Sequence, residues 1–224
     1  MGKEKKSKGK IIMKKAVIFD MDGTLWDTTP LIYEVWNATL QRHEDTKHLH
    51  LSLEEIRGLM GKTMYEIGTA IFPGFTVERM EEIFTECTDD EDNALVLRGG
   101  ELYPGLEDTL KLLKDKYHLS IVSNGQEKYA ENFINFYGFE DLFEDEETFG
   151  RTKLSKAENI KLMIKRNNVD EAVYIGDTHQ DETSAREAGV PFIFAAYGFG
   201  TAESPDKSIN SLTELPNALE EMGF

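Results

Sequence analysis

The sequence of 224 residues predicts an α/β fold, in which a parallel sheet is covered by helices on both faces and a small α-helical domain follows the first strand. Short apolar runs with β-branched centres recur along the chain, and helical periodicity separates each of them from the next. Strands and helices in this alternation are typical of parallel sheets. One long stretch, residues 28–100, contains helical patterns only, and it predicts the inserted domain.

The first predicted strand is residues 14–20, an apolar run that ends abruptly in the letters DMDGT. Such a run is typical of a buried parallel strand that leads into a loop. Comparable runs follow at residues 119–123, 172–177 and 191–195, with a weaker candidate at 147–149. Because sheets of this kind bind ligands at the carboxyl ends of their strands, we expect the functional residues to follow these runs.

The helices of the sheet domain are predicted from apolar residues spaced three or four apart. This spacing is found in residues 105–117, 127–137 and 157–166, each of which lies between two predicted strands. A further helix is expected after the strand at residues 172–177, ending at Gly189, since glycine commonly terminates helices. The chain therefore alternates between strand and helix throughout its second half.

The inserted stretch predicts a small group of helices. Ser52 with Glu55, and Thr63 with Glu66, match the capping box, so a helix is expected to begin directly after Ser52 and another after Thr63. Two longer helices are expected before and after these, at residues 31–42 and 77–97.

These patterns divide the chain into a core, residues 13–27 and 101–224, and a helical cap, residues 28–100. The connections between the two are rich in Gly, Pro and Thr, which is typical of hinges. A small domain hinged over the strand ends can act as a lid. The lysine-rich residues 1–12 lack an apolar segment of signal-peptide length, and we interpret them as a disordered leader or tag.

The charge of the chain argues against nucleic acid as a partner. The formal net charge is −17, and because the first 15 residues carry +6, the remainder carries −23. Such a surface repels a phosphate backbone, and no basic stripe with interleaved aromatic residues offsets it. A small anionic substrate could still bind at a local positive site.

The apolar runs are too short to cross a bilayer, so no membrane association is expected. Cys87 is the only cysteine, which excludes an intrachain disulfide and is compatible with a reducing cytoplasm. We expect a cytoplasmic protein that is a monomer or a weak homodimer.

Two carboxylates follow the first predicted strand. Asp20 and Asp22 are alternate residues of an extended segment, so both can face the crevice at the strand end, and Gly23 provides the tight turn. Two carboxylates there can divide a catalytic task between them. The alternative is an ordinary strand-to-helix turn in which an aspartate caps the next helix.

A second acidic motif, the letters GDTHQD, follows the strand at residues 172–177 and supplies Asp177 and Asp181. If this strand lies beside the first, Asp177 joins Asp20, and crowded carboxylates repel each other unless a hard cation holds them together. Mg²⁺ is the cation implied, because it binds to one or two carboxylates plus a substrate phosphate. Asp181 has an alternative interpretation as a helix N-cap.

A candidate anion site follows the strand at residues 119–123. Ser123 and Asn124 precede a predicted helix, where a hydroxyl and unpaired N–H groups can bind an anion, although both residues are also common in turns. Lys156 begins the helix before the second acidic motif and could reach the same crevice. Lys153 is a rival for that role, and the sequence leaves the choice open.

Taken together, DMDGTL, the SN pair, a lysine and GDxxxD resemble, in this order, the haloacid dehalogenase-like hydrolase superfamily. The PG at 104–105, the YGFG at 197–200 and the inserted helices are most similar to its phosphoglycolate phosphatase-like branch with a small cap. The resemblance extends from residue 13 to the end of the chain. It implies a three-layer Rossmann-like core with an inserted small α-helical cap.

The resemblance also implies roles for individual residues. Asp20 would be the nucleophile and Asp22 the general acid/base, while Ser123 and Lys156 would hold the phosphoryl oxygens, with Asn124 and Thr24 assigned beside them. Mg²⁺ would be bound by Asp20, the backbone carbonyl of Asp22 and Asp177, and we add Asp181 to this acidic set. Many relatives have Pro directly after the lysine, whereas Ala157 follows Lys156 here.

The function expected from this resemblance is Mg²⁺-dependent hydrolysis of a small phosphorylated metabolite, through an aspartyl-phosphate. The substrate could be phosphoglycolate-like, a sugar phosphate or a nucleotide. A sugar phosphomutase like β-phosphoglucomutase is the close alternative, and a non-enzymatic phospho-acceptor module is a more distant one. Three residues are candidates for contacting the substrate: Lys62, Arg57 and Trp26. Surface charge and core packing are equally natural interpretations of these residues.

Overall fold

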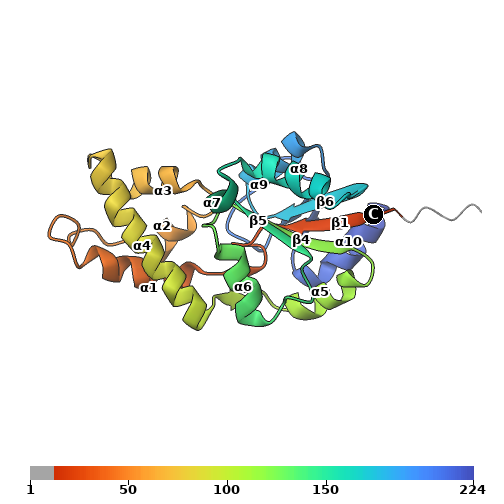
Figure 1. Ribbon diagram of the computed structural model, residues 1–224, viewed down its shortest axis with the longest axis horizontal. Coiled ribbons are helices and arrows are strands. Elements are labelled where there is room, and N and C mark those ends of the chain that lie inside the picture. The colour runs from red at the N-terminus through yellow and green to blue at the C-terminus, as the bar shows by residue number, and fades with distance from the viewer. Residues whose placement is uncertain (1–12) are drawn as a thin grey trace, which may run out of the picture.

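The computed structural model describes residues 13–224, and residues 1–12, interpreted above as a leader or tag, lie outside that range. The molecule is elongated, with the sheet at one end and a group of helices at the other (Figure 1). No helix within the described range has the length and apolar composition needed to cross a membrane.

A six-stranded parallel sheet forms the core, with the strand order β5-β4-β1-β6-β7-β8. Strand β1 is central, because Phe19 pairs with Ile121 of β4 on one side and with Ile175 of β6 on the other. The predicted strands are all present, and β8 is an addition that the sequence analysis missed. The bounds are β1 Lys15–Phe19, β4 His118–Ser123, β5 Asp145–Thr148, β6 Glu171–Gly176, β7 Phe192–Ala195 and β8 Lys207–Ile209.

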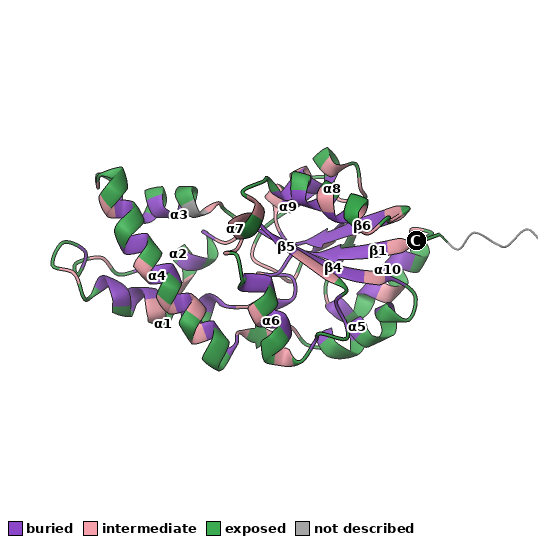
Figure 2. Ribbon diagram, in the orientation of Figure 1, coloured by how far each residue is buried: buried purple, intermediate pink, exposed green. Residues whose placement is uncertain are grey.

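Helices cover both faces of this sheet, which gives the expected three layers (Figure 1). Alternate residues of β1 point to opposite faces, with Val17 and Phe19 in one apolar cluster and Ala16 and Ile18 in the other. The strands are buried almost throughout (Figure 2). The first face is covered by α5 (Leu106–Lys114), α6 (Tyr129–Tyr137) and α10 (Leu215–Glu221), and the second by α8 (Lys156–Arg166) and α9 (His179–Ala188).

The helices within residues 29–98, which we call the cap helices, are α1 (Thr29–Leu40), α2 (Leu53–Arg57), α3 (Met64–Ile71) and α4 (Val77–Arg98). They enclose an apolar cluster of their own, in which Trp36 of α1 and Phe84 of α4 meet edge to face. Both predicted capping boxes are present, at Ser52 and Thr63. Helix α1 begins earlier than expected, because Pro30 occupies its first turn, where proline is well tolerated.

The two connections between the cap helices and the sheet, which the sequence analysis interprets as hinges, pair with each other, and the sequence does not predict this pairing. They run antiparallel and form a short ribbon, β2 (Trp26–Asp27) with β3 (Glu101–Leu102). Gly100 allows this close approach, since a Cβ there would lie 3.0 Å from the side chains of Thr28 and Trp26. A two-residue ribbon depends on tertiary contact and leaves no periodicity in the sequence.

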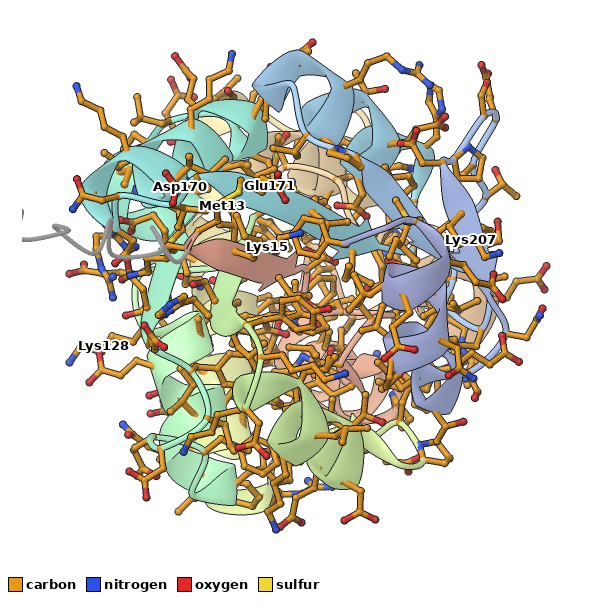
Figure 3. All side chains as sticks on the ribbon, turned by 90° about the vertical axis from the view of Figure 1, so that its right-hand side faces the viewer. Met13, Lys15, Lys128, Asp170, Glu171 and Lys207 are labelled. Atoms are coloured by element: carbon orange, nitrogen blue, oxygen red, sulfur yellow. The ribbon has the colours of Figure 1, made fainter. Side chains whose placement is uncertain are left out.

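The amino ends of the strands lie at the end of the molecule opposite the cap helices, and Figure 3 looks onto them. Lys15 Nζ lies 2.8 Å from Glu171 Oε2, and 5.0 Å from the centre of the Phe224 ring. The backbone N–H of Lys14 donates to Asp170 Oδ2 at 2.7 Å. Lys15 and Glu171 thus form an ion pair at the surface of this end.

Candidate active site

Three neighbouring strands deliver polar side chains to one point at their carboxyl ends. Asp20 follows β1, Ser123 is the last residue of β4, and Asp177 follows β6. The backbone N–H of Asp20 donates to Ile175 O at 2.8 Å, so the β1–β6 ladder continues up to the aspartate. Each of these side chains is buried.

Lys156 lies among these carboxylates. It is the first residue of α8, placed there by a capping box at Ser155, and its Nζ donates to Asp20 Oδ1 at 2.8 Å and to Asp181 Oδ1 at 2.6 Å. Burial alone would lower the pKa of Lys156, but the attraction of Asp181 and Asp20 outweighs it and holds the pKa above its usual value. The lysine therefore stays charged.

Lys153, the rival candidate, lies elsewhere. Its Nζ is 5.7 Å from the centre of the Phe149 ring, and its backbone has a left-handed φ of 59° at the end of the short helix α7 (Phe149–Thr152). The structure thus brings Lys156, and not Lys153, to Asp20.

Asp20, Asp177 and Asp181 form an acidic cluster, with one carboxylate oxygen of each lying within 4.8 Å of the others. Burial raises the pKa of Asp20 to about 7, an effect that Lys156 opposes and Asp181 reinforces. Burial, Asp181 and Asp20 together raise the pKa of Asp177 well above its usual value. Three carboxylates with a single ammonium are short of positive charge.

The oxygen atoms of this cluster show where a cation fits. Asp177 Oδ2 accepts a hydrogen bond from the Phe199 N–H at 2.7 Å, while Asp177 Oδ1 is buried and has no hydrogen-bond partner among residues 13–224. Both oxygens of Asp181 are engaged, Oδ1 with Lys156 and Oδ2 with the N–H and hydroxyl of Thr178. The unpaired oxygen beside Asp20 suits a hard cation such as Mg²⁺, and Asp181 is the member that positions Lys156.

Two glycines make room for Asp177. Gly23 has a φ of +84°, and a Cβ at this position would lie 2.0 Å from Asp177 Oδ2. A Cβ on Gly198 would lie 2.3 Å from the Cβ of Asp177. Both positions therefore require glycine, which accounts for the G of DMDGT and for the first G of YGFG.

Asp22 lies at the same strand end and is held by two hydroxyl groups. Thr28 Oγ1 and Tyr129 OH each donate to Asp22 Oδ1 at 2.8 Å. Burial raises the pKa of Asp22, while the hydrogen bonds from Tyr129 and Thr28 act in the opposite direction. The sequence analysis missed both donors. In the case of Tyr129, an aromatic residue at helical spacing predicts only core packing.

The Ser123 loop forms another part of the site. Ser123 Oγ accepts a hydrogen bond from the Gly125 N–H at 3.0 Å, and Asn124 Nδ2 donates to Gly61 O at 3.2 Å. The second contact joins the core to the loop between α2 and α3.

A cavity extends from these residues to the cap helices, and Asp20, Asp22, Ser123, Asn124 and Lys156 line its core side. Exposed Lys62, which the sequence analysis names as a candidate for contacting the substrate, also lines it. The opposite wall comes from the cap helices and the loop before α3: Ile32, Trp36, Met60, Ile67, Thr88 and Glu91. Glu91 was not predicted, because it stands in an acidic helix that suggests a solvated face.

Other candidates from the sequence analysis lie away from this cavity. Thr24 is fully buried and does not line it, so its position gives no support to a role in phosphate binding. Trp26 packs against Phe133, with ring centres 4.9 Å apart, and belongs to the core. Arg57 pairs with Asp27 at 3.3 Å, at the base of the cap helices.

Comparisons with known proteins agree with this arrangement. A family model described as haloacid dehalogenase-like hydrolase matches residues 17–195. The pyrophosphatase PpaX of Bacillus pumilus is 27% identical over 209 residues, which cover 89% of this chain and 93% of the relative. Phosphoglycolate phosphatase of Rhodobacter capsulatus is 27% identical over 199 residues, covering 84% of this chain and 86% of the relative.

Solved structures share the fold. A haloacid dehalogenase-like hydrolase from Bacteroides fragilis superposes with a TM-score of 0.79 at 24% identity, covering 91% of this chain and 100% of that one. CbbY from Rhodobacter sphaeroides, solved in complex with phosphate, superposes with a TM-score of 0.74 at 22% identity, covering 91% of this chain and 96% of its own.

Proposed function

The chain belongs to the haloacid dehalogenase-like hydrolases, and from this we propose that it is a magnesium-dependent phosphatase of small phosphorylated metabolites. The observation that carries the proposal is the position of Lys156, whose ammonium bonds to both Asp20 and Asp181 in the acidic cluster to which Asp177, with its unpaired oxygen, also belongs. This is an arrangement suited to holding a phosphoryl group against a carboxylate.

Electrostatics explain why these groups act together. A carboxylate about 3.5 Å from a phosphate dianion is repelled by about 9 kcal/mol at an effective dielectric constant of about 20. Lys156 offsets part of this repulsion. Mg²⁺, held by the carboxylates of Asp20 and Asp177 and the backbone carbonyl of Asp22, would supply two further positive charges at the same place.

In the first step the carboxylate of Asp20 attacks phosphorus, so that the bond from phosphorus to Asp20 forms as the bond to the leaving oxygen breaks. Asp22 donates its proton to that oxygen, a task favoured by the raised pKa that burial gives it. Ser123, Asn124 and Lys156 hold the phosphoryl oxygens, and the product alcohol leaves.

In the second step a water molecule attacks the phosphorus of the aspartyl-phosphate. Asp22, now ionised, accepts the proton from this water, and the bond from phosphorus to Asp20 breaks. Phosphate and the free carboxylate are regenerated. The cap helices, which close the cavity opposite Asp20, would restrict other water from the site.

The test is phosphate release from a panel of phosphomonoesters, measured with Mg²⁺ and with a chelator. We expect Asp20→Asn to lower kcat by about 10⁴-fold or more, since it removes the nucleophile. Asp170→Asn, at the opposite end of the sheet, is the matched control and should retain wild-type activity. Mg²⁺-dependent release that survives in Asp20→Asn would refute the proposal.

The same panel separates the alternatives. Isomerised product from a hexose 1-phosphate, in place of free phosphate, would indicate a phosphomutase. Membership of a hydrolase family argues against the non-enzymatic phospho-acceptor module, which would keep its phosphoryl group without turnover.

A further inference from the structure

The cap side of the cavity contains one carboxyl group in a mainly apolar wall. Glu91 of α4 lines the cavity together with Ile32, Trp36 and Ile67, and only 8% of Glu91 is exposed. On the core side, Asp22 contributes a second carboxyl group and Tyr129 a hydroxyl group to the lining. The wall around Glu91 is thus mainly apolar, while Lys62, Asn124 and Gln126 add polar groups to the cavity.

Glu91 is held in place by its neighbour on α1. Trp36 Nε1 donates to Glu91 Oε2 at 2.8 Å, and the Trp36 ring is fixed in turn by Phe84, with ring centres 5.3 Å apart. Glu91 Oε1 accepts no hydrogen bond from any residue in the range 13–224. One oxygen of a rigidly held carboxyl group therefore remains for a ligand.

No cation in the described part of the chain forms a salt bridge with Glu91. The two lysines that line the cavity are Lys156, which is engaged with Asp20 and Asp181, and Lys62, which is exposed. Burial, with Asp22 and Asp92 adding to it, raises the pKa of Glu91 well above its usual value, as expected of a carboxyl group without a cation.

These contacts bear on the leaving group of the substrate. A leaving group attached to phosphate at Asp20 would extend into this cavity, whose wall includes Glu91. A second anion placed against Glu91 would meet a carboxyl group and apolar side chains, and Lys62, which is exposed, would offer it only a screened charge. A hydroxyl group there could donate to Glu91 Oε1 in place of the water that it gives up.

We infer, on the premise that the proposed phosphatase function holds, that the enzyme prefers phosphomonoesters of uncharged, hydroxyl-bearing alcohols, and that Glu91 determines this preference. This chain would then differ from the relatives named phosphoglycolate phosphatase and pyrophosphatase, whose named substrates carry a second anionic group.

The test compares three substrates that differ at a single group. These are 2-hydroxyethyl phosphate, 2-phosphoglycolate, in which a carboxylate replaces the hydroxyl-bearing carbon, and ethyl phosphate, which has neither group. For the wild type we expect kcat/KM to be roughly tenfold to a hundredfold higher for 2-hydroxyethyl phosphate than for either of the others. A wild type that prefers 2-phosphoglycolate would overturn the inference.

Glu91→Gln identifies the residue responsible, because the amide oxygen can still accept from Trp36 while the acidic group is lost. We expect this variant to raise kcat/KM for 2-phosphoglycolate relative to 2-hydroxyethyl phosphate by about tenfold. Glu82→Gln, an exposed position on the same helix, is the matched control and should leave the ratio unchanged. An unchanged ratio in Glu91→Gln would also overturn the inference.

Hydrolysis of p-nitrophenyl phosphate keeps this result separate from a failure of the proposed function. Its leaving group cannot donate a hydrogen bond, so its hydrolysis by the wild type and by Glu82→Gln reports on the phosphoryl site alone. If the wild type hydrolyses it and Glu91→Gln shows the wild-type substrate ratio, only the inference on Glu91 fails. If the wild type hydrolyses no phosphomonoester, the proposed function fails, and the inference with it.

Discussion

The two ends of the same sheet each carry a lysine–carboxylate pair of the same length, in opposite environments. At the carboxyl end Lys156 lies 2.8 Å from Asp20, and these side chains are 2% and 7% exposed. At the amino end Lys15 lies 2.8 Å from Glu171, with side chains 26% and 42% exposed. Figure 3 shows Lys15 and Glu171 side by side at the molecular surface.

The difference shows that burial, and not the pairing itself, makes one of these ends a candidate active site. Water and salt screen the pair at the amino end, so it affects little beyond itself. At the carboxyl end the carboxylates are poorly solvated, and burial raises the pKa values of both Asp20 and Asp177. Carboxylates that are poorly solvated in this way can bind a metal ion, and the metal ion can in turn bind a phosphoryl group.

Replacing each lysine by methionine should give the largest contrast between the two ends. We expect Lys156→Met to lower kcat/KM by about 10³-fold, because it removes the charge that stabilises the phosphoryl oxygens. Lys15→Met should stay within about twofold of the wild type. Circular dichroism should accompany the kinetics, since Lys156→Met also leaves buried carboxylates without their partner. Equal losses of kcat/KM in the two variants would contradict the claim that only the buried end is an active site.

Removing a single carboxylate at each end should show at which end the metal binds. We expect Asp177→Asn to raise the Mg²⁺ concentration that gives half-maximal activity by about 100-fold, because it removes the unpaired oxygen from the acidic cluster. Asp170→Asn should leave this concentration unchanged. Magnesium titrations of activity measure both. An unaltered Mg²⁺ requirement in Asp177→Asn would place the metal elsewhere.

The carboxylates at the carboxyl end of the sheet should also make the free energy of unfolding of the metal-free protein depend on pH. The pKa of Asp20 is about 7 in the folded chain, against the usual 3.8, because burial disfavours its charged form. Between these values the folded state holds a proton that the unfolded state has lost, so the free energy of unfolding falls as the pH rises from about 4 to 7.

Asp20→Asn should weaken this pH dependence, because an amide does not titrate. Thermal melting in a chelator across that pH range measures the effect, with Glu171→Gln as the control that retains the wild-type slope. Added Mg²⁺ should stabilise the wild type more at the higher pH, since the metal competes with protons for the carboxylates. A slope in Asp20→Asn as steep as that of the wild type would assign the titration to other groups.

The smallest effect is expected for the exposed pair itself. Glu171→Gln should change the free energy of unfolding by less than about 1 kcal/mol, and the change should disappear at high salt, because surface pairs are screened. Chemical denaturation at low and high ionic strength measures this. A larger, salt-independent loss would mean that the amino end is less well solvated than its exposure indicates.

The sequence analysis located the strand ends and the polar residues that follow them, because apolar runs and capping boxes are local patterns. It could not choose between Lys153 and Lys156, since the choice depends on which side chain the start of α8 turns toward Asp20. Strand β5 was only weakly indicated, because its acidic residues do not resemble an apolar run. Arg166, at the end of α8 later in the sequence, forms ion pairs with Asp145 and Glu147 of this strand.

The residues that the sequence analysis missed are those whose role comes from tertiary position alone. Tyr129 and Glu91 stand at ordinary helical positions, and nothing local marks the first as a donor to Asp22 or the second as part of the cavity wall. Thr24 shows the opposite case, in which a residue that belongs to a motif is buried in the core. Motifs indicate the phosphoryl site well and the leaving-group site poorly.

The stereochemical course at phosphorus tests most directly whether Asp20 is a nucleophile. Two successive displacements, first by Asp20 and then by water, each invert the configuration. Hydrolysis of a phosphomonoester made chiral with oxygen isotopes and sulfur should therefore give thiophosphate with net retention. Net inversion would show that water attacks the substrate directly, and would contradict an aspartyl-phosphate on Asp20.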